Sequence, residues 1–147
     1  MPNRQIRAVR TERSITVYQA YDAAIAGPAV AAQRFVAPFK RERMTWIEPS
    51  YLWMTHRCGY ATEPAQERVP AIEPARDGFE WALEHSCLSH GDGRPGWARR
   101  VRRSPVRIQW DPERGWGMRR RRSGLLPVEL PYPVTDELTE TIGASVE

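Results

Sequence analysis

The chain of 147 residues has two cysteines, a single lysine and no long apolar run. Cys58 and Cys87 are too few for a disulfide scaffold, so we expect free thiols. No stretch approaches the roughly 18 apolar residues that a membrane span needs. The Arg-rich start, Met1 to Thr11, has no apolar segment typical of a secretory signal. These absences predict a cytoplasmic protein without a membrane partner, and they leave the oligomeric state open.

Several kinds of catalytic or metal site are also missing. We find no glycine-rich phosphate-binding loop, no Ser-His-Asp order and no cysteine with an obvious activating partner. The histidines and cysteines cluster in two short stretches, but their spacing matches no standard structural zinc site. The residues concerned are His56, Cys58, His85, Cys87 and His90. We therefore predict that the protein holds no metal.

Arginine is unevenly distributed. Lys40 is the only lysine, whereas residues 94–122 carry eleven arginines against Asp111 and Glu113. Trp97 and Trp110 are interleaved with these arginines. Such a segment favours nucleic acid electrostatically. The alternative is a compositional bias of the coding sequence that selects no partner.

Hydrophobic periodicity indicates a mixture of strands and helices. Alternation predicts strands over 14–21, near 68–72 and over 105–111, and helical spacing predicts helices over 23–34, 50–57 and 78–89. In the last helix Phe79, Leu83 and Cys87 would share one buried face, behind a capping box of Asp77 and Glu80. Too few helices separate the strands for a doubly wound sheet. We predict one small α+β domain with a mixed or antiparallel sheet and a few short helices.

The C-terminal part of the chain follows a different pattern. Residues 119–122 are four consecutive arginines, and Pro127, Pro131 and Pro133 follow closely. Proline removes backbone donors, and like charges repel. We therefore divide the chain into a domain over 1–115 and a divergent, Pro-rich, poorly ordered tail over 116–147.

Six segments of the chain resemble an uncharacterised family, the domain of unknown function 4291 proteins. They are RQIRAVR (4–10), ITVYQAY (15–21), FKRERMTWIEPSYLWM (39–54), QERV (66–69), GFEWALEHSCLSH (78–90) and VRIQWDPER (106–114). The family carries no established activity. Members usually have Val-Leu-Ala-Ile where this chain has residues 69–72, Val-Pro-Ala-Ile, and residues 115–147 do not resemble the family.

The stretch VYQAYDAAIA (17–26) is similar to the first strand and helix of ADP-ribosyltransferase-like folds. This resemblance implies NAD as cofactor, with Gln19 at the position that hydrogen-bonds the nicotinamide-side ribose. Trp46 and Ser50 would belong to the middle motif. Glu67 would be the carboxylate that stabilises an oxocarbenium-like state. The alternative is an ordinary amphipathic strand, with Glu67 in an ion pair.

The segment 40–43, Lys-Arg-Glu-Arg, precedes Trp46 and would bind a phosphate while the ring stacks on a base. A solvated charged loop is the alternative. Two hypotheses result. The first is a nucleotide-binding enzyme of the NAD type that resembles ADP-ribosyltransferases; the second is a non-enzymatic nucleic-acid-binding protein that uses the Arg-rich segment 94–122. The first assigns catalysis to Glu67 and Gln19, and cofactor binding to Tyr18, Arg41, Arg43, Trp46 and Ser50.

Overall fold

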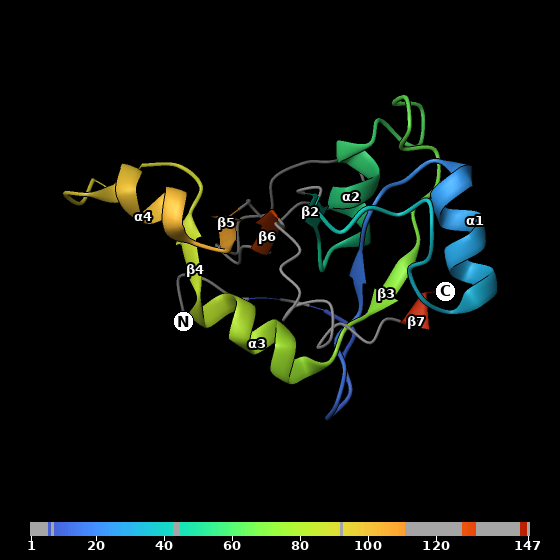
Figure 1. Ribbon diagram of the computed structural model, residues 1–147, viewed down its shortest axis with the longest axis horizontal. Helices are drawn as coiled ribbons and strands as arrows, with labels where there is room; N and C mark the ends of the chain where they lie inside the picture. The colour runs from blue at the N-terminus through green and yellow to red at the C-terminus, as the bar shows by residue number, and fades with distance from the viewer. Residues whose placement is uncertain are drawn as a thin grey trace.

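The computed structural model describes residue 6, residues 8–42, 45–91 and 93–110, and the backbone of residues 128–131 and 145–146. Short strands and helices alternate along the chain (Figure 1). In order, the elements are β1 (Val17–Tyr18), α1 (Ala23–Ala32), β2 (Trp46–Ile47), α2 (Tyr51–Arg57), β3 (Ala71–Glu73), α3 (Arg76–Glu84), β4 (Ser86–Leu88), α4 (Trp97–Arg103), β5 (Val106–Trp110), β6 (Val128–Pro131) and β7 (Ser145–Val146).

The strands form two sheets that meet at one bridge. One sheet has the order β1-β3-β7 and the other the order β2-β6-β5-β4. An antiparallel bridge between Tyr18 and Glu48 joins them, with backbone hydrogen bonds of 2.7 and 3.0 Å in the two directions. Among the described pairs only β4 and β5 run parallel. The predicted α+β fold with a mixed sheet is confirmed.

Apolar residues are buried on both faces of the sheet at strand β1. Val17 belongs to the larger cluster, which includes Phe79 of α3 and Ile108 of β5. The neighbouring Tyr18 packs against the smaller cluster, which includes Met54 of α2. Because successive side chains of a strand point to opposite faces, α3 and α2 cover opposite sides of the sheet. This sandwiched arrangement leaves α4 projecting from one end of the molecule (Figure 1).

Several predicted elements are present where the pattern indicated. Asp22 caps α1, and its carboxylate accepts a hydrogen bond of 2.9 Å from the backbone N–H of Ile25. Ser50 caps α2. Val106 and Ile108 of β5 are buried, whereas Arg107 between them is half-buried. Local sequence signals of this kind, a capping side chain or a strict alternation, do not depend on distant residues.

The predicted helix over 78–89 is wrong at both ends. Helix α3 begins at Arg76 without a side-chain cap, so the capping box of Asp77 and Glu80 is not formed. It ends at Glu84, and Cys87 lies in β4, where it pairs with Arg107 of β5. Sheet pairing has replaced the last helical turn. As a result Leu83 is half-buried, not buried as its helical spacing predicted.

Two strands come from the segment predicted to be a tail. The backbone of β6 pairs with both β2 and β5, and β7 pairs with β3. The other residues of 116–147 lie outside the described part of the chain, so their poor order stays a prediction. Within the described part, no helix is long and apolar enough to cross a membrane.

Candidate functional site

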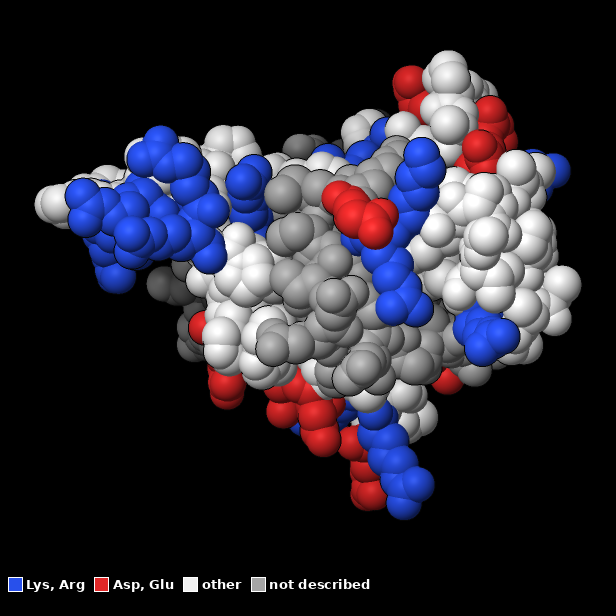
Figure 2. Space-filling view, in the orientation of Figure 1, with Lys and Arg blue, Asp and Glu red and all other residues white. Residues whose placement is uncertain are grey.

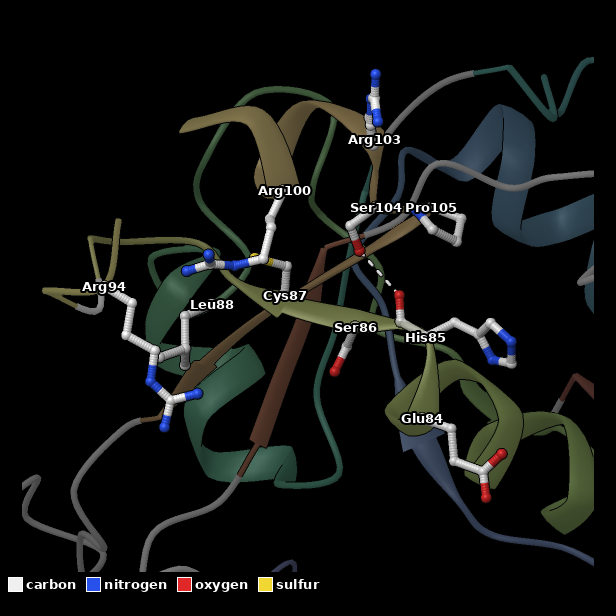
Figure 3. A pocket seen from close by; sticks show the side chains of 10 residues that line it. All are labelled: Glu84, His85, Ser86, Cys87, Leu88, Arg94, Arg100, Arg103, Ser104 and Pro105. Carbon is white, nitrogen blue, oxygen red and sulfur yellow. Dashed lines mark hydrogen bonds between the residues drawn. The ribbon is translucent and has the colours of Figure 1, made fainter. Parts of the chain in front are cut away.

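A cleft of about 720 Å³ opens between β4 and α4. Three arginines line it, Arg94 from the preceding loop and Arg100 and Arg103 from α4. The other lining residues are Glu84, His85, Ser86, Cys87, Leu88, Ser104 and Pro105 (Figure 3). We name this site the arginine cleft.

Both ends of α4 are attached to the two ends of β4. The indole Nε1 of Trp97 donates to the carbonyl of Leu88 at 2.9 Å, and the Ser104 hydroxyl donates to the carbonyl of His85 at 2.8 Å. Gly96, the N-cap residue just before the helix, has a φ of +77°, a conformation that favours glycine. Helix α4 has no buried residue of its own, so these contacts are what hold it over β4. They therefore set the position of its arginines.

The arginines of the cleft differ in direction. Figure 3 shows Arg100 extending from α4 toward Cys87, Arg94 lying beyond Leu88, and Arg103 extending in the direction away from Cys87. The Arg100 Nη1 donates to the carbonyl of Pro95 at 2.7 Å, which fixes its guanidinium relative to the loop. A guanidinium presents donors in a rigid fork that matches phosphate oxygens. The cleft can therefore bind an anion.

Gln19 and Tyr18 point to opposite faces of the sheet. Gln19 is 4% exposed, and its Oε1 accepts a hydrogen bond of 3.2 Å from the Tyr21 hydroxyl. Tyr18 contacts Tyr51 edge-to-face, with ring centroids 5.3 Å apart. The structure thus places the Gln19 amide within the core, on the side away from Tyr18.

Trp46 lies beside an ion pair that the sequence patterns did not indicate. Glu48 is 1% exposed, and its Oε1 lies 2.5 Å from the Nε of Arg57. The Arg57 guanidinium also lies 4.8 Å from the centroid of a Trp46 ring. The available signal was a carboxylate inside the apolar stretch Trp-Ile-Glu-Pro (46–49), nine residues before an arginine at a helix end.

The remaining predicted site residues lie at the surface or outside the described chain. Arg41 is exposed. Glu67 is also exposed, and its carboxylate accepts a hydrogen bond of 3.1 Å from the backbone of Ala65. Arg43 lies outside the described residues. The structure thus brings Tyr18 and Trp46 against one cluster but does not bring Gln19 to that face. The NAD-type enzyme and the roles of Glu67 and Gln19 stay predictions.

Ser50 has a structural role that predicts a measurable effect. Its hydroxyl accepts a hydrogen bond of 3.2 Å from the backbone N–H of Trp53 in the first turn of α2. We expect Ser50→Ala to lower the free energy of unfolding by about 1 kcal/mol, because one N-terminal donor loses its partner. Urea denaturation measures this change. Ser50→Asp should retain the stability, since aspartate caps equally well, and a full loss in that variant would contradict the capping role.

Both cysteines are free, with Cys58 buried and Cys87 half-buried. The structure places Cys87 on a strand rather than in the helix predicted over 78–89. Within the described residues, no group of three or more histidine, cysteine or acidic side chains is arranged to hold a metal ion.

A comparison with protein families gives one match that spans nearly the whole chain. The model of the family described as domain of unknown function (DUF4291) matches residues 5–145. The chain belongs to this family. The DUF4291 match confirms the resemblance of the six segments. It also extends to residue 145, so the expectation that residues 115–147 do not resemble the family is wrong. It gives no support to the resemblance to ADP-ribosyltransferase-like folds. No curated protein matches the chain.

Proposed function

We propose that this DUF4291 protein binds nucleic acid through a basic surface on α4. Five exposed arginines occur within residues 94–103, which comprise α4 and the end of the loop before it, with no acidic residue among them. The basic surface consists of Arg94, Arg99, Arg100, Arg102 and Arg103. Figure 2 shows Lys and Arg side chains covering the projecting end of the molecule where α4 lies. This concentration of like charge on an accessible helix is the observation that supports the proposal.

The arrangement along the helix suits a chain of phosphates. Residues three and four apart are neighbours on a helix surface, so Arg99 lies beside Arg102 and Arg103, and Arg100 lies beside Arg103. Each guanidinium keeps its charge at any working pH and can grip phosphate with two hydrogen bonds. Because phosphate contacts dominate nucleic-acid affinity, such a surface binds with little need for base recognition.

A polymer fits this surface better than a single phosphorylated metabolite. Arg99 and Arg102 do not line the arginine cleft. One phosphate in the cleft would therefore not contact Arg99 or Arg102. A polyanion that crosses the helix would contact them and could place one phosphate beside Arg100.

The double variant Arg99→Gln with Arg102→Gln tests the proposal. We expect its affinity for a fluorescently labelled single-stranded RNA or duplex DNA to fall roughly 10- to 50-fold at ~100 mM salt, because two phosphate contacts are lost. Fluorescence anisotropy measures the dissociation constants, and the two nucleic acids show which form is preferred. Both side chains are exposed, so the fold should be retained.

The matched control removes the same charge elsewhere. Arg13 and Arg34 are exposed and lie outside the basic surface. The double variant Arg13→Gln with Arg34→Gln should bind nearly as well as the unchanged protein. Equal losses in the two double variants would show that only net charge matters and would contradict a dedicated surface.

A further inference from the structure

A second cleft lies between α1 and the segment 33–42, which runs back along that helix (Figure 1). Its volume is about 270 Å³. The lining residues are Tyr21, Ile25, Pro38, Phe39, Lys40 and Thr45. None of them belongs to the arginine cleft, so whatever binds here is independent of the nucleic-acid proposal. We name this site the aromatic cleft.

Its inner wall is a set of mutually packed rings. Tyr21 is 2% exposed and meets Phe39 edge-to-face, with ring centroids 5.9 Å apart. Phe35 stacks on Phe39 with ring centroids 4.2 Å apart, and it meets Tyr21 edge-to-face with centroids 5.7 Å apart. The hydrogen bond from the Tyr21 hydroxyl to Gln19 fixes the tyrosine further. The wall is therefore preorganised, which reduces the entropy lost when a ligand binds.

Few polar groups face this apolar cleft, and they differ in kind. Lys40 is exposed and supplies a cation. Thr45 is half-buried and carries a hydroxyl that can donate or accept a hydrogen bond. An apolar concavity with a small number of placed polar groups is typical of small-molecule sites.

We propose that the aromatic cleft binds a small, planar aromatic ligand that carries one anionic group. The ring packs on Phe39 and Ile25, where apolar surface is buried, and the anion pairs with the Lys40 ammonium. A volume of about 270 Å³ accommodates one ring system with its substituent. This volume is slightly below the usual range of ligand pockets, roughly 300–1,000 Å³, which disfavours an extended dinucleotide inside it.

Two matched pairs of probes test the chemistry. Adenosine 5′-monophosphate is compared with adenosine, and indole-3-carboxylate with the neutral indole-3-carboxamide. Calorimetry and saturation-transfer NMR on the full chain measure binding. At least one anionic probe should bind roughly tenfold more tightly than its neutral partner, because the neutral probe cannot form the charge-assisted contact to Lys40. The pair that shows this difference tells whether the anion is a phosphate or a carboxylate.

The variant Lys40→Gln locates the binding. It should weaken the preferred anionic probe about tenfold and leave the neutral partner unchanged. Arg34→Gln is the control, because Arg34 is an exposed cation at the end of α1 that does not line the cleft. The double variant Arg99→Gln with Arg102→Gln should bind this probe normally, which separates the result from binding at the basic surface.

Three outcomes would overturn the proposal. The first is that neither anionic probe binds, and the second is that neutral and anionic probes bind equally. The third is that Lys40→Gln and Arg34→Gln change the affinity to the same extent. Failure of the unchanged protein to bind nucleic acid, while it still binds the small ligand, would contradict the proposed function alone.

Discussion

Replacing Arg57 with leucine is expected to lower the free energy of unfolding by about 3 kcal/mol. Its partner Glu48 is almost fully buried, and the two side chains meet at 2.5 Å. Removing the cation leaves a carboxylate in a poorly hydrated site, which costs more than the pair itself contributes. The contact with Trp46 is lost as well. Arg57 is 28% exposed, so water can reach the site, and this places the cost at the lower end of the usual range. Urea denaturation followed by circular dichroism measures the change.

A surface ion pair of the same chain supplies the control. Arg76 and Glu80 lie four residues apart on α3 with an Nε–Oε1 distance of 2.7 Å, but their side chains are 38% and 53% exposed. Arg76→Leu should therefore change the stability by less than about 1 kcal/mol. Adding Glu48→Gln to Arg57→Leu should recover part of the loss, since a neutral amide replaces the buried charge. Equal losses in the two leucine variants would show that burial of Glu48 has no special cost.

The ion pair of Glu48 and Arg57 gives Trp46 a structural contact beside its predicted role in binding. In the sequence, Trp46 follows a basic loop, a pattern that suits base stacking. In the structure, Arg57 lies over the ring, and Glu48, two residues beyond Trp46, pairs with that arginine. The partner of a buried charge lies on another element, nine residues away, and no local periodicity indicates it. Ser50, another predicted ligand residue, is engaged as a helix cap.

Elements with strong local signals were predicted, and elements made by distant contacts were not. The alternation of Val106 and Ile108 is sufficient to indicate β5. By contrast, α4 has only polar, aromatic or small residues around Val101 and no buried face. Its position depends on Trp97 reaching Leu88 and Ser104 reaching His85, 9 and 19 residues away along the chain. These contacts depend on the sheet. Because residues 86–88 pair with β5 as strand β4, helix α3 ends at Glu84, and the carbonyls of His85 and Leu88 are available to α4.

The same reason explains what the sequence indicated about the arginine cleft. The abundance of arginine over 94–122 is a compositional fact, and it needs no knowledge of the fold. That Arg100 would lie over Cys87 required Cys87 to be on a strand, whereas its spacing from Phe79 and Leu83 suggested a helix (Figure 3). The number of arginines can be read from the sequence. The cleft that three of them line forms only when β4 joins the sheet beneath α4.

Raising the salt concentration from ~50 to ~200 mM should weaken nucleic-acid binding roughly 500-fold. Each neutralised phosphate of a duplex releases about 0.9 counterion, so five contacts predict a log–log slope of about −4.5. A fourfold increase in salt then lowers the association constant by about 4 to the power 4.5. Fluorescence anisotropy with a labelled duplex at several salt concentrations measures the slope. The five contacts are the arginines of the basic surface, all of which are exposed to solvent.

The double variant Arg99→Gln with Arg102→Gln makes this measurement specific. Two lost contacts should reduce the slope to about −2.7, whereas Arg13→Gln with Arg34→Gln should leave it near −4.5. The slope counts contacts directly and is less sensitive than a single affinity to small changes in folding. A slope near zero in the unchanged protein would mean that phosphate contacts do not drive binding. Binding of that kind would have to come from stacking or base recognition. The exposed face of α4 has arginines but no exposed aromatic ring for stacking. Its one aromatic residue, Trp97, is half-buried and hydrogen-bonded to the carbonyl of Leu88.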